Sequence, residues 1–522
     1  MKIQLTIVAM VLAIMPTFCQ EEFRDWHFKD AKADKVPGIS YAQALTSVEG
    51  KTAKPVIVAV IDGGIDTTHE DLKANLWINS IEIPGNGIDD DGNGYADDIY
   101  GWNFIGGPEG NVEEETMELT RLYRDFKMAE ADGTLMSNSD DWAKYTSIKE
   151  EYDTEFNEAD EMKTYFERLE LIYSISDDLL SKHLGKEDYT MAEVRSIKTT
   201  NEDLRNAQEF FILVEKNGLQ KSDIDDAKKH FDTMVDYYLN LDFNPRTIVG
   251  DNPAEISDSL YGNNDVMGGD PSHGTHVAGI IGAIRNNNLG MDGIATNVKL
   301  MTIRAVPDGD ERDKDVAMGI RYAVNNGADV INMSFGKYYS PHTKMVFDAI
   351  AYAERNGVIM VHAAGNDASD IDSNPHFPTQ EFGASNAENK YWIEVGASSS
   401  SPKKQLPATF SNYGVKTVDI FAPGVDIYSC VPGSKYKAMS GTSMAAPVVT
   451  GVVALILNYY PDLNKEQVKE IIVSAGSDYS KKKVLVPTEE GKAPRAKFSE
   501  LSNSGRVLNA SEALKLSKET LN

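Results

Sequence analysis

The sequence predicts an α/β fold with an open, mostly parallel sheet and one large helical insertion. From Val56 onward, short β-branched runs alternate with helical stretches, which is the pattern of parallel strands joined by helical crossovers. This alternation stops between Glu109 and Asn244, a segment that contains no proline. Apolar side chains recur there at helical spacing, so we expect the insertion to consist of helices.

Six strands and four helices follow from the alternation. The predicted strands are Val56–Ile61, Val298–Ile303, Val330–Met333, Val358–His362, Trp392–Val395 and Val418–Phe421. The predicted helices lie around Gly274–Ile284, Val316–Asn326, Lys344–Asn356 and Ser443–Tyr459. In an open parallel sheet the functional groups gather beyond the carboxyl ends of the strands. We therefore expect the chemistry of this protein at those ends.

The predicted insertion, residues 112–242, is acidic. Two apolar groups show helical spacing, namely Tyr165, Leu169, Ile172 and Tyr173, and Phe231, Met234, Val235 and Tyr238. Residues 111–242 contain 33 acidic and 16 basic side chains, which accounts for more than half of the chain's net charge of −30. We interpret the segment as a helical hairpin or small bundle packed on its own apolar stripe.

The composition of the 522 residues is that of a soluble folded protein, with 41% apolar and 25% charged side chains. The excess of 81 acidic over 51 basic residues opposes nucleic acid and anionic lipid, because phosphate binding requires clustered Lys and Arg. Two cysteines exclude a disulfide framework and a thiolate metal site. The sequence does not indicate an oligomeric state.

Residues 1–19 are typical of a signal peptide. One basic residue precedes the apolar run Ile3–Met15, which is too short to span a bilayer. Thr17 and Cys19 supply small residues before a cut ahead of Gln20. We expect an exported protein without a membrane span, free in the periplasm or outside the cell. The alternative is a lipid anchor on Cys19, which the bulky Phe18 disfavours.

Three polar residues can together activate a serine. Asp62 directly follows the first predicted strand, His273 opens a helix in the motif HGTHVAG, and Ser443 opens another in GTSMAAP. A carboxylate, an imidazole and a hydroxyl are the groups needed to make a serine nucleophilic at neutral pH. His69 and Asp66 are nearby polar alternatives to Asp62, but they do not stand at the strand end, so we interpret them as structural.

These motifs resemble those of the subtilisin-like serine peptidases. IDGGID, HGTHVAG and GTSMAAP occur in the family's order of Asp, His and Ser. The resemblance implies a three-layer α/β/α peptidase domain over residues 56–522, interrupted by the insertion and preceded by an N-terminal extension at residues 20–55. It also implies an endopeptidase acting on peptides or proteins. In such an enzyme Ser443 attacks the scissile carbonyl, His273 takes its proton and Asp62 orients the imidazole.

The resemblance further implies an oxyanion hole and a P1 pocket. Asn366 and the N–H of Ser443 would donate hydrogen bonds to the oxyanion. The pocket walls would be Ser334, Phe335 and Gly336 on one side and Ala363, Ala364 and Gly365 on the other, with small residues that admit a large P1 side chain. Asp367 is either a determinant for a basic P1 residue or a solvated acid. Gly63 departs from the family, which usually has Ser or Thr there to hydrogen-bond the catalytic carboxylate.

An acidic loop predicts a calcium site. Its oxygen-bearing side chains stand at alternate positions with glycine sixth, as in an EF-hand loop. The expected ligands are Asp89, Asp91, Asn93 and Asp97, with Asp98 as the alternative to Asp97. Tyr100 replaces the usual bidentate Glu at the twelfth position. Hard oxygen ligands without His or Cys favour Ca²⁺, and an acidic turn without metal is the alternative.

A second calcium site is implied by the resemblance alone. Asp71 and Asn287 match the family's site near the N-terminus, although the loop 286–291 has one extra residue. In both loops we expect calcium to have a structural role.

The same residues leave other functions open. The chain could be a scaffold or binding protein that docks through the insertion, or its triad could serve an esterase or transferase. Subtilases usually carry an inhibitory propeptide, for which the short stretch from Gln20 to Pro55 has no room. We therefore expect any self-inhibition to come from residues 20–55 or from the insertion lying over the cleft.

Overall fold

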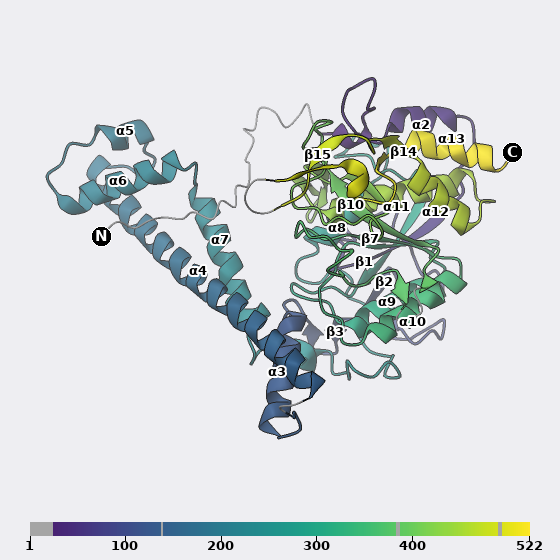
Figure 1. The fold of residues 1–522 in the computed structure, drawn as a ribbon, viewed down its shortest axis with the longest axis horizontal. Coiled ribbons are helices and arrows are strands. Elements are labelled where there is room, and N and C mark those ends of the chain that lie inside the picture. The colour runs from purple at the N-terminus through teal and green to yellow at the C-terminus, as the bar shows by residue number, and fades with distance from the viewer. Residues whose placement is uncertain (1–23, 137–138, 383–386, 489–492) are drawn as a thin grey trace. The chain divides into compact units, whose positions relative to one another are not determined.

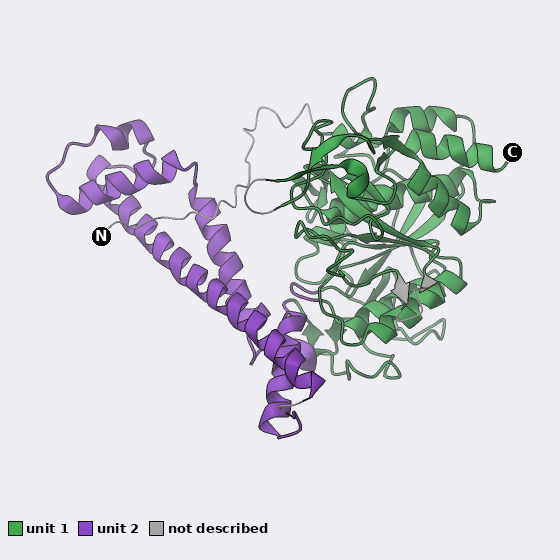
Figure 2. Cartoon of the chain, viewed as in Figure 1, with its two compact units in different colours: residues 1–113, 248–306, 311–522 green, residues 114–247, 307–310 purple. Residues whose placement is uncertain are grey.

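The computed structural model describes residues 24–136, 139–382, 387–488 and 493–522. The chain forms two compact units (Figure 2). Unit 1 comprises Met1–Glu113, Ile248–Val306 and Glu311–Asn522, and unit 2 comprises Glu114–Thr247 and Pro307–Asp310. The predicted insertion 112–242 falls almost entirely in unit 2, but Val112 lies in the core of unit 1. The predicted signal peptide and the alternative lipid site at Cys19 lie outside the described residues.

A nine-stranded sheet forms the centre of unit 1 (Figure 1). Its strands are β1 Val56–Asp62, β2 Gly101–Asn103, β5 Val298–Arg304, β6 Val330–Met333, β7 Ile359–Ala363, β10 Trp392–Ser398, β11 Ile420–Pro423, β14 Gly476–Asp478 and β17 Arg506–Leu508. They lie in the order β14-β17-β11-β10-β7-β6-β1-β5-β2. Neighbouring strands are parallel, apart from β14, which is antiparallel to β17. The predicted mostly parallel sheet is therefore confirmed.

Helices cover both faces of this sheet. The helices of unit 1 are α2 Tyr41–Ser47, α8 Ser272–Gly282, α9 Asp313–Asn325, α10 Thr343–Arg355, α11 Thr442–Tyr459, α12 Lys465–Ser474 and α13 Ala510–Thr520. Alternate side chains of β1 enter two separate cores, because successive strand residues point to opposite faces. Val58 and Val60 pack with α8 and α11, whereas Ala59 and Ile61 pack with α9 and α10. This arrangement confirms the three-layer α/β/α architecture.

The central helix α11 positions the start of the GTSMAAP motif. It is long and apolar enough to cross a membrane by length and composition, but 89% of that stretch is buried inside unit 1. Small and β-branched residues such as Ala446 and Val449 let it pack closely on the sheet. Its buried body fixes its first turn, and with it Ser443.

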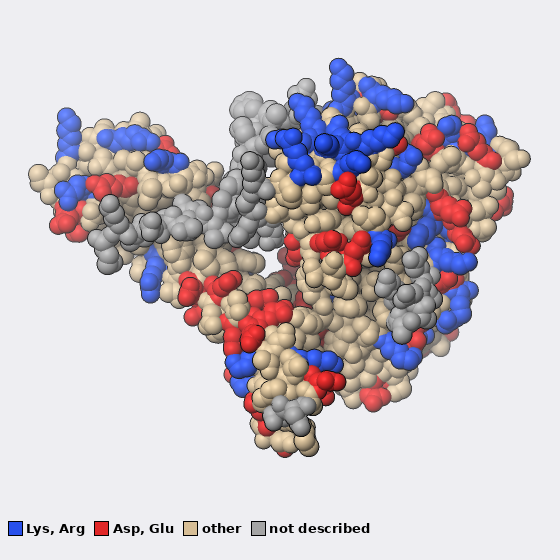
Figure 3. Space-filling view, viewed as in Figure 1, with Lys and Arg blue, Asp and Glu red and all other residues tan. Residues whose placement is uncertain are grey.

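Unit 1 also contains short hairpins and 3₁₀ turns. They comprise β3 Gly106–Gly107 with β4 Gly110–Asn111, β8 Glu381–Phe382 with β9 Ala387–Glu388, β12 Ile427–Val431 with β13 Lys435–Met439, β15 Lys483–Leu485 with β16 Arg495–Lys497, and the 3₁₀ turns η2 Trp26–Phe28 and η6 Phe498–Glu500. The 3₁₀ turn η4 Pro245–Ile248 begins in the chain segment of unit 2 and ends at the first residue of the next segment of unit 1. Figure 3 shows Lys and Arg side chains gathered over the β15–β16 hairpin, where Lys483, Arg495 and Lys497 are exposed. The negative charge of the chain is thus unevenly distributed.

Unit 2 is helical, as the sequence predicts. Its helices are α3 Glu118–Ala131, α4 Asp140–Leu184, α5 Met191–Ser196, α6 Glu202–Lys216, α7 Lys221–Thr233 and the π-helical turn η3 Met234–Tyr238. The 45-residue α4 packs against α6 and α7. Leu180 of α4 is fully buried with Leu204 and Phe211 of α6. Phe166 and Phe231 stack with ring centroids 5.6 Å apart, so the unit has an apolar core of its own.

Candidate active site

The three predicted triad residues come from the ends of three elements in unit 1. Asp62 is the last residue of β1, which lies between β5 and β6 in the sheet. His273 and Ser443 are the second residues of α8 and α11. The carboxyl end of a central strand and the N-terminal turns of two packed helices therefore supply the three groups.

The structure brings Asp62 and His273 into direct contact. Nδ1 of His273 lies 2.8 Å from Oδ1 of Asp62, and the N–H of Gly63 donates to the same oxygen, also at 2.8 Å. The second carboxylate oxygen, Oδ2, is buried and has no hydrogen-bond partner among the described residues. A Cβ atom at Gly274 would lie 2.2 Å from the carbonyl oxygen of Gly64, so the glycine of HGTHVAG allows this close approach.

The environment of His273 favours its charged form. Burial of the ring opposes protonation, but the charge of Asp62 and the hydrogen bond to it outweigh burial and raise the pKa of His273 above its ordinary value. The carboxylate accepts from Nδ1, so the neutral ring carries its proton there and presents Nε2 as a base. The pair is therefore arranged to accept a proton and to stabilise the resulting imidazolium.

Ser443 lies against the loop that follows β6. Its hydroxyl donates to the carbonyl of Ser334 at 3.1 Å, and the hydroxyl of Ser334 donates to the carbonyl of Ser443 at 3.0 Å. Within the described residues the Ser443 hydroxyl makes no hydrogen bond to His273. Catalytic hydrogen bonds of this kind are often long without substrate and tighten when substrate binds.

Asn366 is oriented to donate from its amide nitrogen. Its Oδ1 accepts hydrogen bonds from the N–H of Thr442 at 2.8 Å and from the Thr442 hydroxyl at 3.1 Å. Asn366 is solvent-exposed, and within the described ranges its Nδ2 makes no hydrogen bond, so this group can donate to an oxygen outside the protein. Thr442 also accepts from the N–H of Gly365 at 3.1 Å. The sequence analysis missed this role of Thr442, although the residue lies in the GTSMAAP motif.

The first predicted wall of the P1 pocket contacts Ser443 through Ser334, and the second contacts the neighbouring Thr442 through Gly365. Ser334, Phe335 and Gly336 follow β6, and Ala363, Ala364 and Gly365 end or follow β7, the adjacent strand. Buried Asn412 holds the second wall, because it donates to the carbonyl of Ala364 from Nδ2 and to that of Gly365 from its N–H, both at 2.9 Å. Asp367 accepts a hydrogen bond from the hydroxyl of Tyr338 at 2.6 Å.

The polar alternatives near Asp62 have structural partners. His69 contacts the carbonyl of Lys435 through Nε2 and the N–H of Asp71 through Nδ1, each at 3.1 Å. Asp66 accepts from the N–H of Thr68 and the N–H of Gly433, both at 2.9 Å. These contacts tie the loop after β1 to the β12–β13 hairpin and leave Asp62 as the carboxylate that contacts His273.

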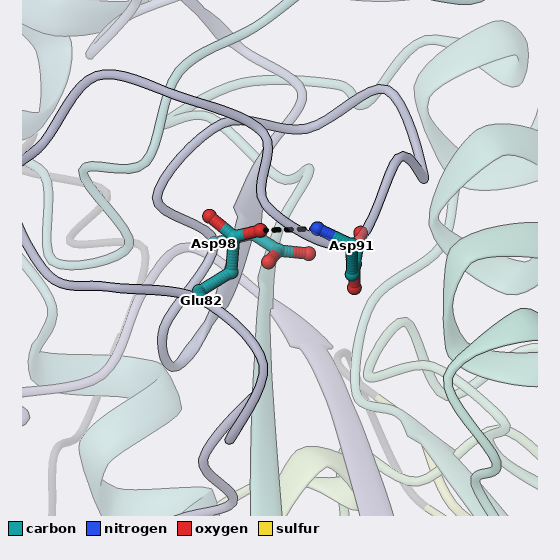
Figure 4. A group of neighbouring side chains, drawn as sticks. All are labelled: Glu82, Asp91 and Asp98. Atoms are coloured by element: carbon teal, nitrogen blue, oxygen red, sulfur yellow. Dashed lines mark hydrogen bonds between the residues drawn. The ribbon is translucent and has the colours of Figure 1, made fainter.

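Three carboxylates gather beside the acidic loop. One oxygen from each of Glu82, Asp91 and Asp98 lies within 4.8 Å of the others (Figure 4). Nδ2 of Asn79 donates to Asp91 at 2.9 Å and to Asp98 at 2.7 Å, and no ion pair involves the three acids in the described part of the chain. Burial raises the pKa of Asp98. This arrangement of hard oxygen ligands fits a divalent cation such as Ca²⁺.

This cluster differs from the ligand set predicted by spacing. It includes Asp91, and Nδ2 of Asn93 lies 3.1 Å from both Asp91 and Asp98. Among the described residues, the group of three close carboxylates does not include Asp89 or Asp97. Asp89 accepts from the N–H groups of Gly92 and Gly94 at 2.8 Å, and Asp97 accepts from those of Gly85 and Gly87 at 2.7 and 2.8 Å. Both carboxylates therefore fold the loop, and the sequence analysis missed Glu82.

Asp71 and Asn287 meet at the second predicted calcium loop. Oδ1 of buried Asp71 accepts from Nδ2 of Asn287 at 2.6 Å, and Oδ2 lies 3.3 Å from both the N–H of Met291 and the hydroxyl of Tyr436. The guanidinium of Arg24 donates to the carbonyl of Gly290 at 2.5 Å. The oxygen atoms that could bind a cation at this loop are those of one carboxylate and of the loop carbonyls.

Most of the chain is similar in sequence to proteins of a known family. The sequence model of the Subtilase family matches residues 53–492. The Thermophilic serine proteinase of Bacillus sp. strain AK1 is 39% identical over 226 residues, which are 43% of this chain and 50% of that protein. Subtilisin DY of Bacillus licheniformis is 36% identical over 208 residues, 40% of this chain and 70% of that protein. The match thus spans half the length of the first relative.

One solved structure aligns along almost the whole chain. It is described as "Proteases from Pseudoalteromonas arctica PAMC 21717", and it covers 95% of this chain and 98% of its own. Its TM-score is 0.48 and its sequence identity is 19%.

Proposed function

Because the chain belongs to the subtilase family, we propose that it is a serine endopeptidase with Asp62, His273 and Ser443 as its catalytic triad. The observation that carries this proposal is the 2.8 Å contact of Asp62 with Nδ1 of His273. This contact leaves Nε2 of His273 as the base. The contact lies at the carboxyl end of β1, and Ser443 is in the first turn of α11.

The proposed reaction uses these groups in turn. Oγ of Ser443 attacks the carbonyl carbon of the scissile peptide, and His273 takes the hydroxyl proton. The carbonyl oxygen becomes an oxyanion that accepts from Nδ2 of Asn366 and the N–H of Ser443. The imidazolium then gives its proton to the leaving amine as the C–N bond breaks. Water, deprotonated by His273, hydrolyses the acyl-enzyme and restores the serine.

A probe that reacts covalently with activated serines tests this assignment. We expect labelling of the folded protein and none of Ser443→Ala, with peptide hydrolysis lost in parallel and melting unchanged. Ser440→Ala, three residues earlier, is the matched control and should be labelled like the natural protein. Absence of labelling in the natural protein would favour the scaffold alternative. Labelling with turnover of esters and not of peptides would favour esterase or transferase chemistry.

We also propose that calcium stabilises the loops of unit 1. Glu82, Asp91 and Asp98 would hold one ion, with the amide of Asn93 beside them, because three close carboxylates without a cationic partner repel one another. Asp71 and Asn287 would contribute to a second site. These ions would be structural and would supply no step of the reaction.

Export is part of the same proposal. The apolar run Ile3–Met15 after Lys2 supports removal of residues 1–19 and release into the periplasm or the medium. The substrates would then be peptides or proteins outside the cytoplasm. Comparing the N-terminus of the protein purified from culture medium or periplasm with Gln20 tests this point.

A further inference from the structure

A histidine ring fills the space between the two walls of the P1 pocket. A Cβ atom on Gly336, in the first wall, would lie 2.2 Å from Cε1 of His376. A Cβ atom on Gly365, in the second wall, would lie 3.1 Å from the same atom. Both walls therefore carry glycine where the ring approaches, and the imidazole of His376 lies between them.

His376 is buried and neutral. Its exposed fraction is 8%, and Nδ1 has no hydrogen-bond partner among the described residues. Burial, together with the charge of His362, lowers the pKa of His376 to about 3. The ring is therefore uncharged at neutral pH and offers no counter-charge to an acidic side chain.

A second histidine prevents the ring from moving deeper. His362 contacts Oε1 of Glu394 through Nδ1 at 2.9 Å and the carbonyl of Phe335 through Nε2 at 2.8 Å. The ring of His362 is therefore held at both of its nitrogens. Its centroid lies 5.9 Å from that of His376. His362 and Glu394 are both buried and joined by this contact, so they form a fixed layer next to His376.

The residues that follow the two walls in the sequence are hydrogen-bonded to each other. Tyr338, two residues after Gly336, donates its hydroxyl to Oδ2 of Asp367 at 2.6 Å. Asp367 is two residues after Gly365, and Nδ2 of Asn412 lies 3.3 Å from the same oxygen. The ring of Tyr338 meets that of His376 edge-on, with centroids 5.3 Å apart. The carboxylate of Asp367 is thus engaged with the opposite wall.

We propose that His376 is a specificity-determining residue that restricts P1 to small uncharged side chains such as Ala and Ser. This inference rests on the proposed peptidase function and refines it. An aromatic P1 side chain needs the space that the imidazole fills. A basic P1 side chain needs the same space and meets the neutral ring of His376, while the carboxylate of Asp367 accepts a hydrogen bond from Tyr338. The pocket is therefore shallower than the family resemblance implies.

The P1 profile of the natural protein tests the proposal directly. Peptides that differ only in a P1 residue of Ala, Phe or Lys are compared by kcat/KM. We expect Ala to exceed both Phe and Lys by at least about tenfold, since a hydrophobic pocket discriminates by about 10- to 200-fold for a difference of one methylene. A preference for Phe or Lys would overturn the proposal while leaving the peptidase assignment intact. Absence of any cleavage together with absence of serine labelling would instead overturn the proposed function.

The variant His376→Ala tests the residue itself. Removing the ring should raise kcat/KM for the Phe peptide at least about tenfold relative to the Ala peptide. His183→Ala, at an exposed histidine of α4, is the matched control and should keep the natural ratio. An unchanged ratio in a His376→Ala protein with native-like melting would overturn the assignment. The P1 profile of the natural protein remains decisive if this variant does not fold.

Discussion

Asp62 directs one carboxylate oxygen to both His273 and Gly63, while its other oxygen is buried without a hydrogen-bond donor among the described residues. The two hydrogen bonds are each 2.8 Å long. An unpaired buried acceptor costs stability, because the group loses its contacts with water and gains none in the protein. The carboxylate is therefore correctly placed for His273 but incompletely satisfied.

Gly63→Ser should stabilise the protein. A Cβ atom at this position would meet the carbonyl oxygen of Val306 at 3.2 Å, a small adjustment, and the new hydroxyl can donate to Oδ2 of Asp62. We expect a gain of about 1 kcal/mol in the free energy of unfolding, measured by chemical denaturation. Gly63→Ala adds the carbon without the donor and is the control. Equal stability of the two variants would show that the unpaired oxygen carries no cost.

Asp62→Asn should lower kcat by about 10⁴-fold, as expected when the carboxylate of a triad becomes an amide. It should also shift the pH profile. Only neutral His273 accepts a proton, so the raised pKa makes activity rise with pH through a point above the ordinary histidine value. Without the charge of Asp62 the pKa of His273 falls. The acidic limb of kcat/KM should therefore move to lower pH, and an unmoved limb would contradict the assignment.

Removing calcium should lower the melting temperature more than it lowers kcat. An ion that binds only the folded state stabilises it by about 2.7 kcal/mol at one hundred times its Kd. Asp98→Asn should abolish most of the calcium-dependent shift, because Asp98 is buried within the carboxylate cluster. Asp89→Asn is the control, which should destabilise the loop yet keep the calcium response. An EDTA-treated protein with unchanged melting would show that neither loop binds calcium.

Replacing unit 2 should alter the choice between large and small substrates. The insertion joins the chain between Asp62 and His273, two residues in contact. We expect that exchange of Glu114–Thr247 for a Gly/Ser linker raises activity on folded proteins relative to a short peptide. Val112 and Glu113 stay, since Val112 is in the core of unit 1 and Glu113 pairs with Arg304 at 2.8 Å. A lower or equal ratio with native-like melting would identify unit 2 as a docking or stabilising element.

The long strands could be predicted because strands that are buried on both faces consist mostly of apolar residues. β1 and β5 are buried at nearly every position, so their sequences are rich in apolar and β-branched residues. β2 and β17 have three residues each and show no periodicity to detect. β2 and β17 become strands because they pair with β5 and β11, which lie far away in the sequence, and the local sequence does not indicate such a pairing.

The carboxylate cluster and His376 show the same limit at the level of side chains. Spacing identifies the acidic loop, but it does not tell which carboxylates turn inward. Asp97 accepts hydrogen bonds from N–H groups of the loop. Asp98 instead lies close to Glu82, a residue that is not part of the motif. His376 carries no motif of its own, and its role arises because its loop brings it between Gly336 and Gly365.

The order of the strands also determines when the proposed triad can assemble during synthesis. β1 pairs with β5 and β6, which are made more than two hundred residues later, and Ser443 follows later still. A nascent chain on the ribosome therefore contains neither the Asp–His contact nor its nucleophile until most of the polypeptide has been translated. Folding dominated by such distant pairings is slow. An unfinished chain therefore lacks the complete set of residues that the proposed triad requires.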